Sequence, residues 1–362
     1  MHPLNDLKLI KEGDKSGMGE RLLSFHSQCE TAVSAAKNLE FPFYSEGIEN
    51  IVISGMGGSA AGGNILTSYL KRGLKIPCVV NRNYFFPGFA AEKTLAIIIS
   101  YSGNTEETLS SLNDGYKRGS KIIAIASGGA VEEFCSEKGI PLIKISGGQQ
   151  PRESLGYLFF PLLILMEKIG FVEGQEREIL ETIEVLKILS KSYSPETIET
   201  ENDAKMLSIA IHGKIPLLYG VQDITDSIAW RWKCQFNENS KIPAFYSVFP
   251  ELNHNEIEGW DMHHEFGDKF FIIILRSEDE DDHISRQIEI TKTILSDRVS
   301  GLREVWGKGK GRLAGIFSLI YLGDFVSYYL AILNGVDPTP IRNIERLKKQ
   351  LRSWGVKELM SQ

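Results

Sequence analysis

The chain has 362 residues, of which 42% are hydrophobic and 24% are charged, and its formal net charge is −7. A chain of this length exceeds what a single hydrophobic core usually organises, so two folded domains are expected. The net negative charge argues against nucleic acid, and against an anionic membrane, as the main partner.

Short apolar runs alternate with helix-length segments through the first half of the sequence. Such runs are typical of strands buried on both faces, and the segments between them predict a parallel sheet with helices on either side. The predicted strands are Ile51–Gly55, Pro77–Arg82, Leu95–Ser100, Lys121–Ser127 and Pro141–Ser146. The predicted helices are Gly19–Leu39, Ser59–Leu70, Leu155–Leu165 and Gly174–Lys191.

The same alternation begins again after a polar connection at Tyr193–Asn202. Strands are predicted at Ile215–Val221, Pro243–Phe249, Phe270–Arg276 and Leu302–Trp306, and helices at Thr225–Asn237, Asp282–Asp297 and Arg312–Leu333. We therefore expect two doubly wound, mainly parallel α/β domains of flavodoxin-like type, over residues 1–195 and 196–362, with helices on both faces of each sheet. The acidic run Glu278–Asp282 is expected to be a solvated loop that caps the next helix.

The N-terminal segment and the cysteines indicate the cellular compartment of the protein. The first residues contain no apolar signal region, and no apolar stretch is expected to reach the roughly 20 residues that span a membrane. The four cysteines are far apart and form no CxxC pair, so neither a zinc site nor a disulfide scaffold is predicted. These features predict a cytoplasmic protein with reduced thiols.

Two predicted strand ends carry small hydrogen-bonding residues. Ser100–Leu109 reads SYSGNTEETL, and Ile51–Gly63 reads IVISGMGGSAAGG. Each could be no more than a tight strand-to-helix turn. Two such loops at the carboxyl edge of one sheet favour a site for a small phosphorylated ligand, because the amides at a helix start attract anions. The glycine spacing does not fit GxGxxG and no GxxxxGK[ST] occurs, so neither a dinucleotide nor a nucleoside triphosphate is indicated.

The pair GMGGSA and SYSGNTEET resembles the signature of the sugar isomerase (SIS) domain. Further segments resemble the bifunctional phosphoglucose/phosphomannose isomerase family: QPRESLGYL at Gln150–Leu158, FNENSK at Phe236–Lys241, ELNHNEIEGW at Glu251–Trp260 and the ending VDPTPIRNIERLK. The resemblance spans about Ile51 to Lys348. It implies two SIS domains and an aldose–ketose isomerase that uses no cofactor and interconverts glucose 6-phosphate, and mannose 6-phosphate, with fructose 6-phosphate. It also implies a phosphate site built from Gly58, Ser59, Ser100, Ser102 and Thr105.

Such a reaction moves a proton between adjacent carbons, and it needs a carboxylate base, a cation near the developing oxyanion and a group that opens the sugar ring. Glu238 lies between two asparagines at the end of a predicted helix. From the residue pattern alone, a glutamate on the protein surface is the simpler interpretation, but the resemblance implies that Glu238 is the base. His254 is equally compatible with an exposed loop histidine, whereas the resemblance implies that it opens the ring in the partner's active site of a homodimer.

Two basic residues complete the site that the resemblance implies. Arg152 lies between a strand end and a helix, where an arginine is usually solvated, but the resemblance implies that it stabilises the enediolate. Lys348 lies on a charged C-terminal helix beside Arg346 and Lys349, as is typical of an exposed face. The resemblance implies an active-site lysine here and leaves the register between Lys348 and Lys349 open.

The sequence leaves three alternatives to this hypothesis. His263, His264 and Glu265 suggest a metal site, but the side chains of adjacent residues diverge, so no metal is predicted. A sugar-phosphate-binding regulator without catalysis usually carries a DNA-binding helix-turn-helix, which the sequence does not indicate. The isomerase half of an amidotransferase would need an N-terminal nucleophilic cysteine, and the first cysteine here is Cys29.

Overall fold

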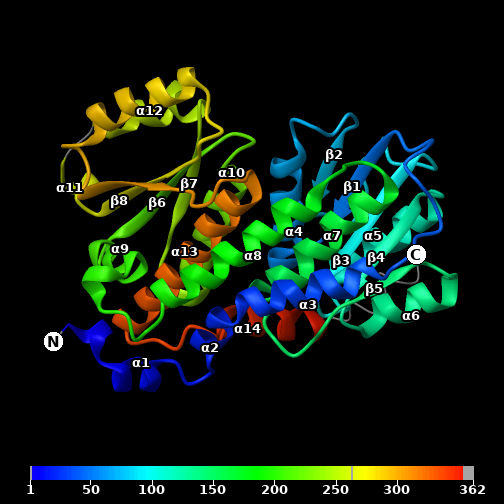
Figure 1. The fold of residues 1–362 in the computed structure, drawn as a ribbon, viewed down its shortest axis with the longest axis horizontal. Helices are drawn as coiled ribbons and strands as arrows, with labels where there is room; N and C mark the ends of the chain where they lie inside the picture. The colour runs from blue at the N-terminus through cyan, green and yellow to red at the C-terminus, as the bar shows by residue number, and fades with distance from the viewer. Residues whose placement is uncertain (1, 262–263, 354–362) are drawn as a thin grey trace.

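The computed structural model of the chain describes residues 2–261 and 264–353, without the side chains of 264–265 and 352–353. It contains two sheets, one of five strands and one of four, and all strand pairs are parallel (Figure 1). The predicted class of two doubly wound α/β units is therefore confirmed.

The first sheet has the order β2-β1-β3-β4-β5 and the second has the order β7-β6-β8-β9. Each strand lies within two residues of its predicted position, except that β5 is shorter. The strands are β1 (Asn50–Ser54), β2 (Cys78–Asn81), β3 (Thr94–Ser100), β4 (Lys121–Ala126), β5 (Leu142–Lys144), β6 (Ile215–Val221), β7 (Phe245–Phe249), β8 (Phe270–Arg276) and β9 (Gly301–Trp306).

Helices surround and connect the two sheets. Those in the first half are α1 (Leu7–Gly13), α2 (Met18–Leu23), α3 (Phe25–Lys37), α4 (Gly57–Leu70), α5 (Glu106–Lys117), α6 (Gly129–Lys138), α7 (Leu155–Ile169) and α8 (Gln175–Ser192). Those in the second half are α9 (Asp203–Ile211), α10 (Asp226–Gln235), α11 (His264–Gly267), α12 (Asp282–Leu295), α13 (Arg312–Leu333) and α14 (Arg342–Ser353).

Each sheet is covered on both faces, as β3 illustrates. Because side chains alternate along a strand, Leu95 and Ile97 face a core that includes α3, α7 and α13, while Ala96 and Ile98 face the side covered by α5 and α6. The first of these cores also contains Ile273 of β8, so it is continuous across both sheets. Helices α7, α8 and α13 accordingly lie between the two sheets (Figure 1).

Helix α13 corrects one expectation from the sequence. It is long and apolar enough to cross a membrane, which the sequence analysis had excluded for every segment. It is instead a core helix, since 94% of its most apolar 18-residue segment is buried inside the fold. The Tyr321 hydroxyl donates to the Leu22 carbonyl at 2.8 Å, which ties α13 to the N-terminal helices.

The acidic run after β8 corrects a second expectation. Asp281 caps α12 as predicted, because its carboxylate accepts the amides of His283 and Ile284. The run is not simply a solvated loop, however. Only 2% of the Glu280 side chain is exposed, and it lies 2.8 Å from the buried guanidinium of Arg276.

Candidate active site

The two small-residue loops converge at the carboxyl edge of the first sheet. Strands β1 and β3 are neighbours, with Ser54 opposite Ile98. Beyond them, the Tyr101 amide donates to the Ser59 hydroxyl oxygen at 3.0 Å. This bond joins the first turn of α4 to the loop before α5, so the two small-residue segments lie together, as expected from the sequence.

The phosphate-binding candidates differ in accessibility. Ser59 and Ser100 are buried, and the Ser100 hydroxyl donates to Thr105 Oγ1 at 3.4 Å. Ser102 is exposed, and its hydroxyl accepts the Asn104 amide at 3.3 Å. Helices α4 and α5 both begin without a side-chain cap. Their first amides are therefore available to an anion, which the helix dipoles also favour.

Gly103 gives the second loop its shape. Its φ of 67° lies in the left-handed region, and a Cβ there would lie 1.6 Å from the Gly128 carbonyl oxygen. Only glycine avoids that overlap, so packing alone requires a glycine at position 103.

Gly58 brings the first loop against Arg152. A Cβ on Gly58 would lie 2.7 Å from the Arg152 amide nitrogen. The Arg152 side chain is only 3% exposed, although the sequence alone favoured a solvated position. Burial lowers the pKa of its guanidinium, and the charge of Glu238 acts in the opposite direction.

Three hydrogen bonds fix the Arg152 guanidinium. Its Nε donates to Asn239 Oδ1 at 2.7 Å, and its Nη2 donates to the carbonyls of Pro338 at 3.1 Å and Thr339 at 2.7 Å. The remaining Nη1 lies 3.6 Å from Glu238 Oε2. The guanidinium is therefore held rigidly and presents Nη1 on the side of Glu238.

Glu238 lies on a π-helical turn, Phe236–Ser240, that follows α10. The turn is anchored to α13, because Asn239 Nδ2 donates to Ser327 Oγ at 2.9 Å and Ser240 Oγ donates to the Ser327 carbonyl at 2.7 Å. The Glu238 side chain is 26% exposed. Its carboxylate is thus positioned by a rigid turn yet remains open on one side.

A buried ion pair supports Arg152 from behind. Arg231 Nη2 lies 2.8 Å from Asp324 Oδ2, and both side chains are at most 5% exposed. The same Nη2 donates to the Arg152 carbonyl at 3.0 Å, and Gln235 donates to Asp324 at 2.6 Å. Sequence analysis did not find this pair, because residues this far apart in the chain give no local signal.

Lys241 is a further residue that sequence analysis missed, although it lies in the segment FNENSK. It adopts a φ of 59°, and its Nζ donates to the Pro338 carbonyl at 3.0 Å, so it shares that acceptor with Arg152. Burial and the neighbouring Arg152 charge lower the pKa of Lys241 to about 8. Two cations therefore meet beside Glu238.

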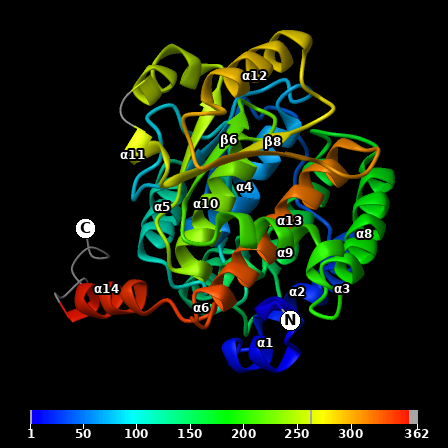
Figure 2. The same cartoon turned by 90° about the vertical axis from the view of Figure 1, so that its left-hand side faces the viewer.

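The structure does not bring His254 or Lys348 into this cluster. His254 is exposed at the end of the 3-10 helix Glu251–His254. Lys348 is exposed on α14, as is Lys349, and α14 lies at the periphery of the molecule (Figure 2). Glu256, near His254, accepts a hydrogen bond from the Tyr219 hydroxyl at 2.7 Å.

The described part of the chain contains no group of three or more His, Cys, Asp or Glu residues that could hold a metal ion. Of the three residues weighed for such a site, His263 and the side chains of His264 and Glu265 lie outside the described residues.

Comparisons with known proteins show what the whole chain is similar to. A family model described as the bacterial phospho-glucose isomerase C-terminal SIS domain matches residues 200–351, and the SIS domain model matches residues 46–134. A bifunctional phosphoglucose/phosphomannose isomerase of Caldicellulosiruptor bescii is 44% identical, over 92% of this chain and 98% of that protein. One of Aquifex aeolicus is 36% identical, over 84% of this chain and 91% of that protein.

Among solved structures, a glucose-6-phosphate isomerase like protein from Thermus thermophilus has a similar fold, with a TM-score of 0.63 and 20% identity. The similarity covers 94% of this chain and 99% of that chain. Both sheets are therefore part of a fold found in other proteins.

Proposed function

Because the chain belongs to the bifunctional phosphoglucose/phosphomannose isomerase family, we propose that it interconverts glucose 6-phosphate and mannose 6-phosphate with fructose 6-phosphate through an enediolate. The observation that supports this most directly is the approach of Glu238 to Arg152 beside Gly58. A carboxylate that removes the proton and a cation that stabilises the resulting oxyanion are the two groups that this reaction needs close together.

The phosphate would bind at the joined loops before α4 and α5. Hydroxyls of Ser59, Ser100, Ser102 and Thr105 supply neutral donors, and the amides near Gly58 supply the electrostatic attraction of a helix start. Neutral donors suit a ligand that must be released in every turnover, whereas several fixed cations would hold a dianion more tightly. Gly58 lies against Arg152, so a sugar that extends from this phosphate site reaches the reacting groups.

Glu238 is proposed to carry the proton between C1 and C2, and Arg152 Nη1 to contact the oxygen that becomes negative. Nη1 is suited to this role because Nε and Nη2 are already committed to protein acceptors. Lys241 adds a second positive charge nearby. No cofactor is required, because the proton and electron pair move within the sugar.

His254 and Lys348 fit the site only if another surface brings them to it. We propose a homodimer in which His254 opens the ring in the neighbour's site, with Lys348, or Lys349, as an additional active-site cation. We also propose domain limits of 1–195 and 196–362, no metal, and a cytoplasmic location. The alternative is a sugar-phosphate-binding protein that shares the loops but lacks the catalysis.

Replacement of the base tests the proposal. Glu238→Gln keeps the shape and hydrogen bonding of the side chain but removes its basicity, so fructose 6-phosphate should still bind. A general base contributes of order 10²–10⁴ in rate, so kcat should fall by at least about a hundredfold. Deuterium from solvent should also stop entering C2 of glucose 6-phosphate.

Glu256→Gln is the matched control, because Glu256 is the other candidate base and is held by Tyr219. It should retain near-normal turnover and exchange. Loss of exchange in this variant, with retention in Glu238→Gln, would assign the base to Glu256. A wild-type protein that binds fructose 6-phosphate without turnover would favour the non-catalytic alternative.

A further inference from the structure

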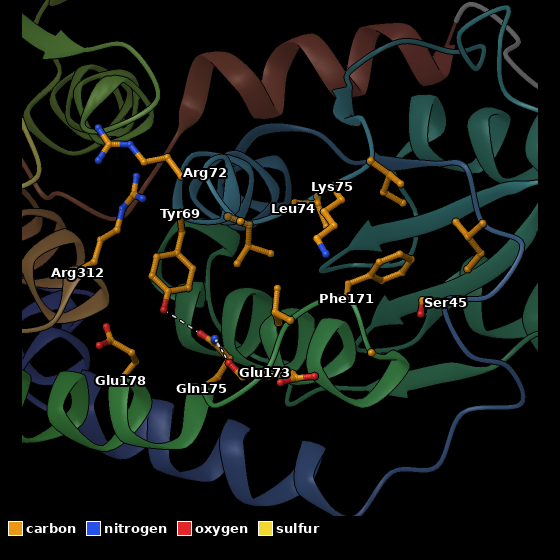
Figure 3. A pocket seen from close by; sticks show the side chains of 16 residues that line it. Ser45, Tyr69, Arg72, Leu74, Lys75, Phe171, Glu173, Gln175, Glu178 and Arg312 are labelled. Atoms are coloured by element: carbon orange, nitrogen blue, oxygen red, sulfur yellow. Dashed lines mark hydrogen bonds between the residues drawn. The ribbon is translucent and has the colours of Figure 1, made fainter.

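A large cavity lies away from the candidate active site, between the end of α4, the α7–α8 connection and the start of α13 (Figure 3). Its volume is about 840 Å³. The side chains around it come from both halves of the chain, with Arg72 and Arg312 together at one end and Lys75 away from them (Figure 3). None of the residues assigned above to substrate binding or catalysis lines it.

One end of the cavity contains two arginines, Arg72 and Arg312. Arg72 Nη2 donates to the Asp279 carbonyl at 3.1 Å, and Arg312 Nε lies 3.2 Å from the Asp279 carboxylate. The contact between Arg312 Nε and the Asp279 carboxylate is too poorly aligned to be a hydrogen bond. The buried Arg312 Nε therefore has no hydrogen-bond partner among the described residues. Lys75 also lines the cavity, away from the two arginines (Figure 3). Two arginines therefore meet at Asp279, one at its carbonyl and one at its carboxylate.

The other walls combine apolar and hydrogen-bonding groups. Leu70, Leu74 and Phe171 line the cavity, and the Tyr69 hydroxyl donates to Gln175 Oε1 at 2.8 Å. The carboxylate of Glu178, which also lines it, accepts the Leu313 amide at 3.1 Å and so offsets the positive start of α13. An apolar wall opposite a basic end suits a ligand with an apolar or aromatic body and one anionic group.

The cavity is linked to the active site by two rigid elements. Helix α4 has 14 residues, so it is about 21 Å long, and Gly58 lies at its opposite end. Arg312 begins α13, and Ser327 further along this helix holds the turn that carries Glu238. Arg312 Nη2 also donates to the carbonyls of Ser68 and Asp223, both at 3.1 Å, and so connects the two halves of the chain.

We propose that this cavity is an effector site for a small organic anion, a phosphate or carboxylate with an apolar portion. The anionic group would bind Arg72 and Arg312 in competition with Asp279, and Lys75 would add a positive charge farther along the cavity. Such binding changes the contacts of Arg312 with α4 and with the loop after β6, and thereby the relative position of the phosphate loops and Glu238. The effect on turnover rests on the proposed isomerase function, whereas the binding itself does not.

Binding to the full chain is measured by titration calorimetry with four separate probes: AMP, phosphoenolpyruvate, citrate and inorganic phosphate. Saturating fructose 6-phosphate is present throughout, so that the active site is occupied. At least one organic probe should bind with a dissociation constant below about 1 mM, and inorganic phosphate should bind more weakly because it lacks an apolar body. The Arg72→Ala/Lys75→Ala variant should bind that probe at least about tenfold more weakly.

Two controls separate this site from the active site. Arg286→Ala removes an exposed arginine on α12, remote from the cavity lining, and should leave binding unchanged. Ser102→Ala/Thr105→Ala impairs the proposed phosphate site and should also leave probe binding unchanged. Absence of binding by all organic probes, or its loss in the Ser102/Thr105 variant alone, would overturn the proposal.

The kinetic arm tests the effector role. The bound probe should change KM or kcat for fructose 6-phosphate by at least about twofold in the wild type and have no effect in the Arg72/Lys75 variant. Binding without any kinetic change overturns the effector role. A wild-type chain without isomerase activity would instead contradict the proposed function, and the calorimetric result would still decide whether the anion site exists.

Discussion

Glu238 Oε2 lies 3.6 Å from Arg152 Nη1, and the two residues belong to different halves of the fold. Arg152 leads into α7, which packs in the core beside the first sheet, and Glu238 follows α10 beside the second. The Pro338 and Thr339 carbonyls hold the Arg152 guanidinium, and Ser327 of α13 holds the turn that carries Glu238. The spacing of these two groups therefore depends on how the halves of the chain pack together.

Gly58→Ala should impair catalysis through that packing. The added Cβ would lie 2.7 Å from the Arg152 amide nitrogen, so Arg152 and the phosphate loop must move apart. Misplacement of about 1 Å commonly costs about a hundredfold in rate, so kcat/KM for fructose 6-phosphate should fall by that order. Steady-state kinetics measure the loss.

Gly315→Ala serves as its control. Gly315 lies on α13, a Cβ there meets nothing within 4 Å, and alanine is the better helix former. This variant should match the wild type in kcat/KM and unfold no more easily. Normal kinetics for Gly58→Ala would show that catalysis does not depend on the position of the phosphate loop relative to Arg152.

Lys241 predicts an alkaline limit to activity. Its pKa is lowered to about 8, from 10.5, so the ammonium group beside Glu238 loses its proton above about pH 8. If this charge helps to stabilise the enediolate, kcat/KM should decline above that pH. The same lowered pKa affects stability in the opposite direction. Between pH 8 and 10.5, Lys241 is protonated to a greater extent in the unfolded chain than in the folded protein. Its contribution therefore makes the free energy of unfolding rise with pH.

Lys241→Arg separates the role of the charge from that of packing, because an arginine stays protonated over the whole range. The alkaline limb of its pH–rate profile should move to higher pH, and Lys241→Met should lose activity at all pH values. An alkaline limb that is unchanged in both variants would mean that another group titrates there.

The strands were predictable because parallel strands buried on both faces are continuous apolar runs. Leu95–Ser100 and Ile215–Val221, for example, match β3 and β6 to within one residue. The acidic run was misjudged for the opposite reason. Glu280 is charged, and its burial depends on Arg276, a pairing that composition does not reveal.

The candidate site was predictable in its residue types but not in its geometry. The loop residues Ser59 and Ser102 stand in recognisable motifs, and the register of β1 and β3 brings their loops together. The carbonyls that hold Arg152 belong to the segment after α13. The π-helical turn that carries Glu238 is anchored to α13 itself. Contacts of such long sequence separation give no periodic signal in a single sequence.

The buried pair behind Arg152 should dominate the stability of this region. Asp324→Asn leaves the Arg231 charge buried without its partner, which typically costs about 3–5 kcal/mol in the free energy of unfolding. Urea unfolding followed by circular dichroism measures the change. The double variant Arg231→Met/Asp324→Leu should lose less, because it removes both charges. A loss below about 1 kcal/mol for Asp324→Asn would contradict this assignment.

The exposed positions of His254 and Lys348 lead to a test of shared active sites. Glu238→Gln and His254→Ala chains should each be inactive alone. After subunit exchange, half of the dimers contain one chain of each kind, and each of these has one site with both groups intact. Activity should therefore recover to about a quarter of the wild-type value. Differently tagged chains, purified in sequence, establish that exchange has occurred. Mixed dimers without activity would show that each chain completes its own site, and His254 would then have no role in the neighbour.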